Sequence, residues 1–221
     1  MKTVIKDLPI LDLRNVLPSV LENVERVENV RSVVLAPEQV EAFMRVSRVN
    51  VRSHLIVTPE ETLAIGQIEF NDTYFDSLAD GTRLVVLGHL FVDGFTPELF
   101  LRKVGGLRMY GQIFYSDKHS AGLILSRLTR LQGQLLSMSP QAIRWIGSTY
   151  LDTKLLREVA SRPVVSVGPI VVDPQLEAAD IQSGFSSVTQ IGEILGKEPQ
   201  VCAVLSVCRN RLGPYSLSAV S

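Results

Sequence analysis

Imidazole, hydroxyl and carboxylate side chains are the groups in this sequence that could support acid–base or nucleophilic chemistry. The chain has three imidazoles, those of His54, His89 and His119. Around His119, the segment Ser116–Ser120 contains an aspartate and two serines, from which a serine–histidine–aspartate triad can be drawn. The same composition is typical of a surface turn, which is the interpretation we prefer. The histidines therefore predict no catalytic residue.

Neighbouring acidic residues indicate a second possible chemistry. Glu60, Glu61 and Asp72 could provide the paired carboxylates of a glycoside hydrolase. A polysaccharide site would also need aromatic platforms, but aromatic residues make up only 6% of the chain. The single tryptophan, Trp145, stands in an apolar segment and fits a core position better than a platform. A β-helical enzyme acting on a polysaccharide therefore remains the alternative function, and our first prediction is that the chain is not an enzyme.

The sequence contains few of the residues and motifs that bind metals or cofactors. Cys202 and Cys208 are the only cysteines and are six positions apart, so the chain lacks the Cys-x-x-Cys spacing of zinc sites. The pair Gly105–Gly106 is not followed by Gly-Lys-Ser and does not match a phosphate-binding loop. We interpret this pair as a helix stop before the next strand. No metal and no cofactor are predicted.

The composition is that of a folded protein with balanced charge. Hydrophobic residues make up 46% of the 221 positions, and 22 basic residues face 23 acidic ones, for a net charge of −1. Nucleic-acid binding is not expected, because it usually requires a basic excess or stripe. No apolar run reaches the roughly 20 residues of a membrane span, and the first residues lack the apolar core of a signal peptide. With so few cysteines, a cytoplasmic location is expected.

A glycine recurs at an almost constant spacing and is followed two positions later by isoleucine or leucine. Successive glycines are 22, 23, 22, 35 and 24 positions apart, and the gap of 35 splits at Gly147 into 14 and 21. Gly147 is a degenerate copy, because threonine stands two positions after it. The repeated glycines are Gly66, Gly88, Gly111, Gly133, Gly147, Gly168 and Gly192. Regular spacing of this kind is the signature of a repeat architecture.

Proline marks the same period. Apolar runs end in proline followed by Glu or Gln, as at Pro97, and proline with a following acid is favourable in the first turn of a helix. Near the N-terminus, Asn29–Pro37 is echoed by Asn50–Pro59. Each coil of about 21–24 residues is therefore predicted to contain a strand, a turn and a return segment that is either a short helix or irregular. We predict an α/β repeat solenoid with one parallel sheet: an N-terminal cap at 1–28, eight or nine coils at 29–210, and a tail at 211–221.

The strands of these coils resemble the leucine-rich repeat, whose strand reads Leu-x-x-Leu-x-Leu-x-x-Asn. The matching segments are Leu63–Asn71, Val85–Asp93 and Val165–Asp173, with glycine in place of the central leucine. The chain is thus similar to divergent bacterial leucine-rich-repeat-like solenoids. That resemblance implies a protein that binds through its surface without enzymatic activity. A parallel β-helix is the alternative architecture.

Alternation along the strands separates two faces of the predicted sheet. The glycines and the residues two positions after them are expected to face inward. On the opposite face we predict apolar anchors at Phe91, Phe114 and Tyr150, and a polar stripe at His89, Gln112 and Gln134. That face is either covered by the chain itself or docks a protein partner or a second copy. The predicted function is accordingly a non-catalytic interaction or scaffold module.

Overall fold

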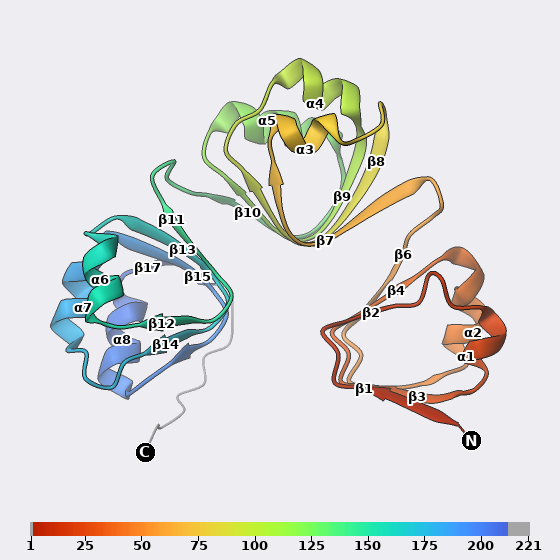
Figure 1. The fold of residues 1–221 in the computed structure, drawn as a ribbon, viewed down its shortest axis with the longest axis horizontal. Helices are drawn as coiled ribbons and strands as arrows, with labels where there is room; N and C mark the ends of the chain where they lie inside the picture. The colour runs from red at the N-terminus through yellow and green to blue at the C-terminus, as the bar shows by residue number, and fades with distance from the viewer. Residues whose placement is uncertain (1, 212–221) are drawn as a thin grey trace. The chain divides into compact units, whose positions relative to one another are not determined.

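The computed structural model describes residues 2–211 and shows a mixed α/β fold with several parallel sheets (Figure 1). The chain divides into two compact units, Met1–Leu136 and Ser137–Ser221. This division does not coincide with the predicted boundary after residue 28, and residues 2–28 already contribute strands to the first sheets. Apart from Arg211, the predicted tail at 211–221 lies outside the described residues.

Unit 1 begins with two small sheets. The strands of the first are β1 (Thr3–Lys6), β3 (Val24–Glu28) and β5 (Ser47–Val49), and those of the second are β2 (Ile10–Asp12), β4 (Ser32–Leu35) and β6 (Ser53–Ile56). All pairs within these sheets are parallel. The helices α1 (Pro18–Leu21), η1 (Pro37–Gln39) and α2 (Val40–Met44) lie between them in sequence. From β1 to α2 the chain passes twice through a strand of the first sheet, a strand of the second sheet and a helical segment, whereas β5 and β6 lead to β7 without a helix.

Unit 1 continues with longer strands. They are β7 (Glu61–Phe70), β8 (Thr82–Val92), β9 (Val104–Tyr115) and β10 (Leu128–Ser137), which form one sheet in this order. The connecting helices are α3 (Asp72–Asp76), α4 (Pro97–Lys103) and α5 (Lys118–Arg127). β7 pairs with β8, and β8 with β9, in parallel and with equivalent glycines opposite each other.

Unit 2 repeats the two-sheet arrangement. One sheet contains β11 (Ile143–Ile146), β13 (Pro163–Val167), β15 (Ser187–Ile191) and β17 (Cys208–Arg211), and the other contains β12 (Thr149–Leu151), β14 (Ile170–Val172) and β16 (Ile194–Leu195). The helices are α6 (Thr153–Val159), α7 (Ala178–Gly184) and α8 (Glu198–Ser206). None of the described helices is both long and apolar enough to cross a membrane.

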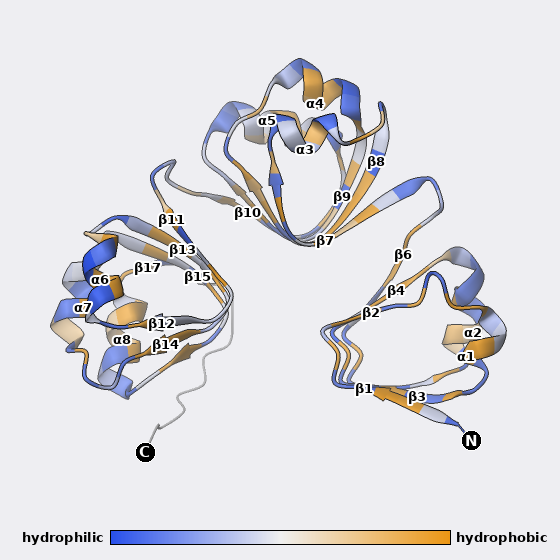
Figure 2. Ribbon diagram, viewed as in Figure 1, coloured by the Kyte–Doolittle hydropathy of each residue, from blue (hydrophilic) through white to orange (hydrophobic). Residues whose placement is uncertain are grey.

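The core of the long-stranded part lies between the sheet and its helices. Leu90 and Ile113, each two positions after a repeated glycine, are fully buried there beside Phe100 of α4. Ile68 and Leu135, at the same position on the two outer strands, pack against this cluster. Figure 2 shows hydrophobic residues recurring along these strands and hydrophilic ones in the turn before β7. The predicted inward direction of this column is therefore correct in β7–β10.

The repeated glycines do not lie on one sheet, contrary to the prediction. The first four belong to β7–β10, whereas Gly147, Gly168 and Gly192 lie where the chain passes from one sheet of unit 2 to the other. All seven have positive φ, between 85° and 154°. The 14 positions from Gly133 to Gly147 are too few for a strand, a helix and a return. They contain the end of β10, a short turn at 138–142 and β11, with no helix. The chain therefore leaves the sheet where we expected a short coil.

Only some of the marked prolines begin helices. Pro37, Pro97 and Pro199 stand in the first turn of η1, α4 and α8, as predicted. Pro59 and Pro140 lie instead in turns that lead directly from one strand to the next. These two helix-free turns separate the consecutive sheets of the chain, because a strand can return to the same parallel sheet only through a longer crossover.

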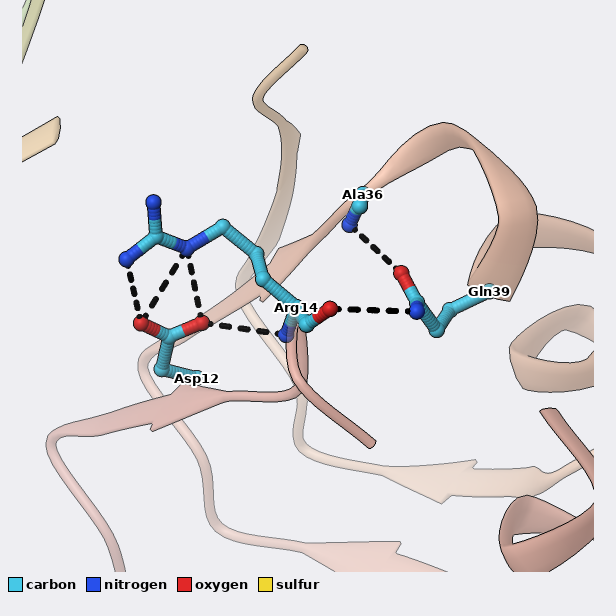
Figure 3. A network of polar contacts seen from close by, with 4 residues as sticks. All are labelled: Asp12, Arg14, Ala36 and Gln39. Atoms are coloured by element: carbon cyan, nitrogen blue, oxygen red, sulfur yellow. Dashed lines mark hydrogen bonds and ion pairs between the residues drawn. The ribbon is translucent and has the colours of Figure 1, made fainter. Parts of the chain in front are cut away.

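A buried glutamine joins neighbouring coils at the end of β4 (Figure 3). The Gln39 side chain is 3% exposed, and its Oε1 accepts the Ala36 N–H at 2.8 Å. Its Nε2 donates to the carbonyl oxygens of Arg14 and Val16 at 3.2 and 3.1 Å. Arg14 in turn pairs with the Asp12 carboxylate at 2.8 Å, and this hydrogen bonding is the main reason why the pKa of Asp12 is lowered. The glutamine thereby satisfies backbone groups that a turn would otherwise leave unpaired.

One aspartate and two asparagines have positive φ where the chain passes between the first two sheets of unit 1. Asp7, Asn29 and Asn50 have φ of 59°, 51° and 53°, and each lies between a strand of the first sheet and a strand of the second. Asn29 Nδ2 donates to Asp7 Oδ1, and Asn50 Nδ2 donates to Asn29 Oδ1, both at 2.9 Å. Asparagine tolerates the left-handed conformation because its short polar side chain can form such local hydrogen bonds.

Replacing Asn29 tests this ladder. Asn29→Ala removes both side-chain hydrogen bonds and places a Cβ-bearing apolar residue at positive φ, so we expect the free energy of unfolding to fall by about 1–2 kcal/mol. Asn29→Gly, the matched control, also removes the hydrogen bonds, but glycine adopts positive φ without strain. Its free energy of unfolding should therefore fall less than that of Asn29→Ala. Urea denaturation measures both. If the alanine and glycine variants were equally stable, the left-handed backbone would not be the controlling factor.

Candidate binding cleft

A cleft of about 280 Å³ lies in unit 1 between its second sheet and the long-stranded sheet. From the second sheet and the segments leading into it come Pro9, Ile10, Arg31, Ser32 and Ser53. From β8, β9 and β10 come Leu87, Gly88, His89, Tyr110, Gly111, Gln112 and Gln132. These residues lie at and beside the glycine corners, so the bends of the strands help to shape the cleft.

The two walls meet through an apolar contact. Val34 and Leu55 of the second sheet form a buried cluster with Val85 of β8, and Leu87 and Tyr110 pack against it. This contact lies on the side of β8 opposite α3–α5, because the residues next to Val85 in sequence, Leu84 and Val86, belong to the helix-side cluster. Part of the face that we considered for docking is therefore covered by the chain itself.

His89 is a mostly buried imidazole in this cleft. Burial is the main cause that lowers its pKa, the nearby Arg31 charge acts in the same direction, and a hydrogen bond with Gln112 opposes both. The His89 Nδ1 atom is buried and has no hydrogen-bond partner within residues 2–211. A neutral imidazole presents one donor and one acceptor nitrogen, so His89 can recognise either kind of polar group.

Hydroxyl and guanidinium groups lie on the opposite wall. The Ser32 and Ser53 oxygens are 3.0 Å apart, and Ser53 also donates to the Arg31 carbonyl oxygen at 3.2 Å. The Arg31 side chain is exposed and forms no ion pair within the part of the chain that the structure describes. This wall therefore offers one positive charge and two hydroxyls.

Tyr110 is fixed by two arginines. The guanidinium carbons of Arg108 and Arg130 lie 5.9 and 5.4 Å from the centre of its ring, within the range of cation–π attraction. Arg108 is itself held by Glu61, with an Nε–Oε1 distance of 3.1 Å, and by a hydrogen bond of 2.6 Å to the Ile56 carbonyl. The aromatic wall of the cleft is thus pre-positioned.

The acids considered for polysaccharide hydrolysis do not line the cleft. Glu61 is paired with Arg108, and Asp72 accepts hydrogen bonds from the N–H and the hydroxyl of Thr96, both at 2.7 Å. The Thr96 bonds lower the pKa of Asp72, and a hydrogen bond with Thr58 lowers that of Glu60. The twelve lining residues include no Asp or Glu, so this cleft has no carboxylate pair for a glycosidase mechanism.

The predicted aromatic patch is wrong. Phe91 and Phe114 are 1% and 0% exposed, and their rings stack with centroids 4.9 Å apart and planes 12° apart. Tyr150 is 54% exposed and belongs to unit 2. Desolvation, followed by the nearby Asp173 and Asp152 carboxylates, raises the pKa of Tyr150. Of the two alternatives for this face, the structure supports coverage by the chain itself at Phe91 and Phe114.

The predicted polar stripe is only partly gathered in one place. His89 and Gln112 line the cleft, while Gln134 is exposed on β10 and does not line it. Sequence reasoning missed Arg31, Ser32 and Ser53. The signal for them was the copied Asn-Val-Arg-Ser at Asn29 and Asn50, which we interpreted only as a repeat.

Comparison with known proteins assigns no family or function to this chain. No protein-family model, curated protein or solved structure matches this chain. Within residues 2–211, no three His, Cys, Asp or Glu side chains gather closely enough to hold a metal ion. The groups available for function in the cleft are therefore its amides, hydroxyls, imidazole, phenol and guanidinium.

Proposed function

We propose that this chain is a non-catalytic interaction module that holds a short, extended segment of a protein partner in the unit 1 cleft. The observation that carries the proposal is the lining of the cleft. Gln112, Gln132 and neutral His89 offer donors and acceptors from adjacent strands, opposite the Ser32–Ser53 hydroxyl pair. Such groups match the alternating N–H and C=O groups of an extended peptide.

The proposal includes a solenoid of leucine-rich-repeat-like build. Its support is the parallel register, in which Gly66, Gly88 and Gly111 stand opposite one another on β7, β8 and β9. Corner residues with positive φ recur every 21–24 positions between the helix-free turns. In this view the protein consists of short stacks of coils, and the cleft lies beside one of them. A cytoplasmic location belongs to the same proposal and agrees with the lack of a disulfide between Cys202 and Cys208.

Arg31 gives the proposed partner a chemical bias. It is the one charged residue among those lining the cleft, and a guanidinium binds carboxylates through paired hydrogen bonds. We therefore expect the bound segment to carry an Asp, a Glu or a C-terminal carboxylate. At about 280 Å³ the cleft is slightly smaller than the roughly 300–1,000 Å³ of typical small-molecule sites, which suits one or two anchoring side chains.

Peptide selection followed by binding measurements tests the cleft. Random displayed peptides selected on the wild-type protein should be enriched in acidic residues, and their affinities can be measured by fluorescence anisotropy. Gln112→Ala should weaken binding about threefold to tenfold through one lost hydrogen bond, and Arg31→Ala tenfold or more through a lost charged one. Gln134→Ala is the matched control, because this exposed glutamine lies outside the lining.

Two results would contradict the proposal. One is that no peptide is enriched over a selection on the Arg31→Ala protein. The other is that Gln112→Ala and Gln134→Ala bind the selected peptides equally well. Melting curves of all three variants must match the wild type for the comparison to concern binding rather than folding.

A further inference from the structure

The β7–β10 sheet ends in two open strands of equal length. β7 and β10 are the outermost strands in the sheet order, and each has ten residues. Around their glycines both strands are exposed, whereas the equivalent residues of β8 and β9 are half-buried or buried. Ile65, beside Gly66 on β7, is 42% exposed. An open edge of this length is a template for pairing with another strand.

The two ends of this stack carry opposite charge. Residues 58–81, which contain β7 and α3, include six acidic residues and no Lys or Arg. Residues 118–137, which contain α5 and β10, include three basic residues and no Asp or Glu. Opposite charge at the two ends favours attraction between the β7 end of one molecule and the β10 end of another, and disfavours contact between like ends.

Gly66, Gly88, Gly111 and Gly133 stand at equivalent positions of the four strands and form a glycine column. At Gly66 this column leaves space for a further strand beside β7. A Cβ added to Gly88, Gly111 or Gly133 would overlap the carbonyl group of the glycine on the preceding strand. At Gly66, by contrast, no atom of residues 2–211 lies within 4 Å of the equivalent point. The side of β7 that meets no preceding strand therefore has room for one more glycine carbonyl, which Gly133 of a second copy can supply.

We propose that copies of this chain associate head to tail, with β7 of one copy adding in parallel beside β10 of the next. Equivalent positions would then stand opposite each other across the junction, as they do between β7 and β8. The contact joins two different surfaces, so it builds open chains or rings of copies rather than a two-fold symmetric pair. It goes beyond the proposed binding of a partner peptide, and Gln67 and Gln134, which the test below uses, do not line the cleft.

Charged substitutions at Gln67 and Gln134 test the proposed junction. Both are exposed, and both directly follow the column glycine of their strand. Within one molecule they are three strand spacings apart, roughly 14 Å. Across the proposed junction they become neighbours at about 5 Å. A pair of charges at these positions therefore matters much more in the assembly than in the isolated chain.

Sedimentation velocity over a concentration series compares four double variants of the full chain. Gln67→Lys with Gln134→Lys, and Gln67→Glu with Gln134→Glu, should each weaken association at least tenfold. Gln67→Glu with Gln134→Lys, and the reverse pair, should associate at least as well as the wild type. Because the two weakened variants differ in net charge by four, a general charge effect cannot explain the loss of both. Association of the wild type should also fall as salt is raised from about 50 to 500 mM.

Three outcomes would overturn the proposal. A wild type that stays monomeric up to the highest soluble concentration excludes the junction. A species that stops at a dimer shows a closed interface instead. Equal association of the like-charged and opposite-charged variants places any contact elsewhere. None of these results depends on peptide binding, so failure of the cleft and failure of the junction are distinguishable.

Discussion

Gly111→Ala is expected to lower the free energy of unfolding by at least about 3 kcal/mol, which is the upper end of the usual cost of overpacking. The added Cβ would overlap the carbonyl oxygen of Gly88 on the neighbouring strand. That atom is backbone in the middle of a sheet and cannot move away as a flexible side chain could. The φ of +141° adds a conformational cost for any residue other than glycine. To admit the methyl group, β8 and β9 must separate.

Gly66→Ala is the matched control for this effect. It introduces the same methyl group at the equivalent position of an outer strand, where φ is +101° and no atom of the described residues lies within 4 Å of the added Cβ. It should cost only the conformational term, about 1–2 kcal/mol. Guanidinium denaturation of both variants gives the difference directly. Equal losses of stability would mean that the close approach of the strands is unimportant.

Replacing both stacked phenylalanines should unfold the protein. Phe91 and Phe114 are almost completely buried and lie against each other. Removing a buried phenylalanine typically costs about 3–5 kcal/mol, and the total stability of a domain is about 5–15 kcal/mol. The double variant Phe91→Ser with Phe114→Ser therefore loses most or all of the available stability. We expect its melting curve, followed by circular dichroism, to show no cooperative transition.

Tyr150→Ser provides the contrast. Tyr150 is the third aromatic residue of the predicted patch but is 54% exposed. The melting curve of the Tyr150→Ser variant should therefore stay close to that of the wild type. A folded double phenylalanine variant that had lost only association would restore the original patch hypothesis. A tyrosine variant that unfolded would show that exposure at this position does not measure its contribution to folding.

The sequence by itself predicted the fold class and one side-chain direction. The structure is a mixed α/β fold with parallel sheets, and Leu90 and Ile113 face the helices as alternation required. These features depend on a few neighbouring residues: the two-residue period of a strand, proline in a first helical turn, and glycine at positive φ. Each is a property of the chain over a short range, so it can be seen without knowing what lies opposite.

Only the tertiary structure decided how many sheets form and which faces are covered. The shortened spacing before Gly147 was interpreted as a degenerate copy, but there the chain turns without a helix and starts another sheet. Whether Phe114 is core or surface, and whether Arg31 comes near His89, depends on the contact of Val34 and Leu55 with Val85 and on other long-range packing. Side chains in one column have the same pattern whether water or another sheet covers them, because hydrophobic burial is non-directional. Long-range packing therefore selects among faces that the sequence leaves equivalent.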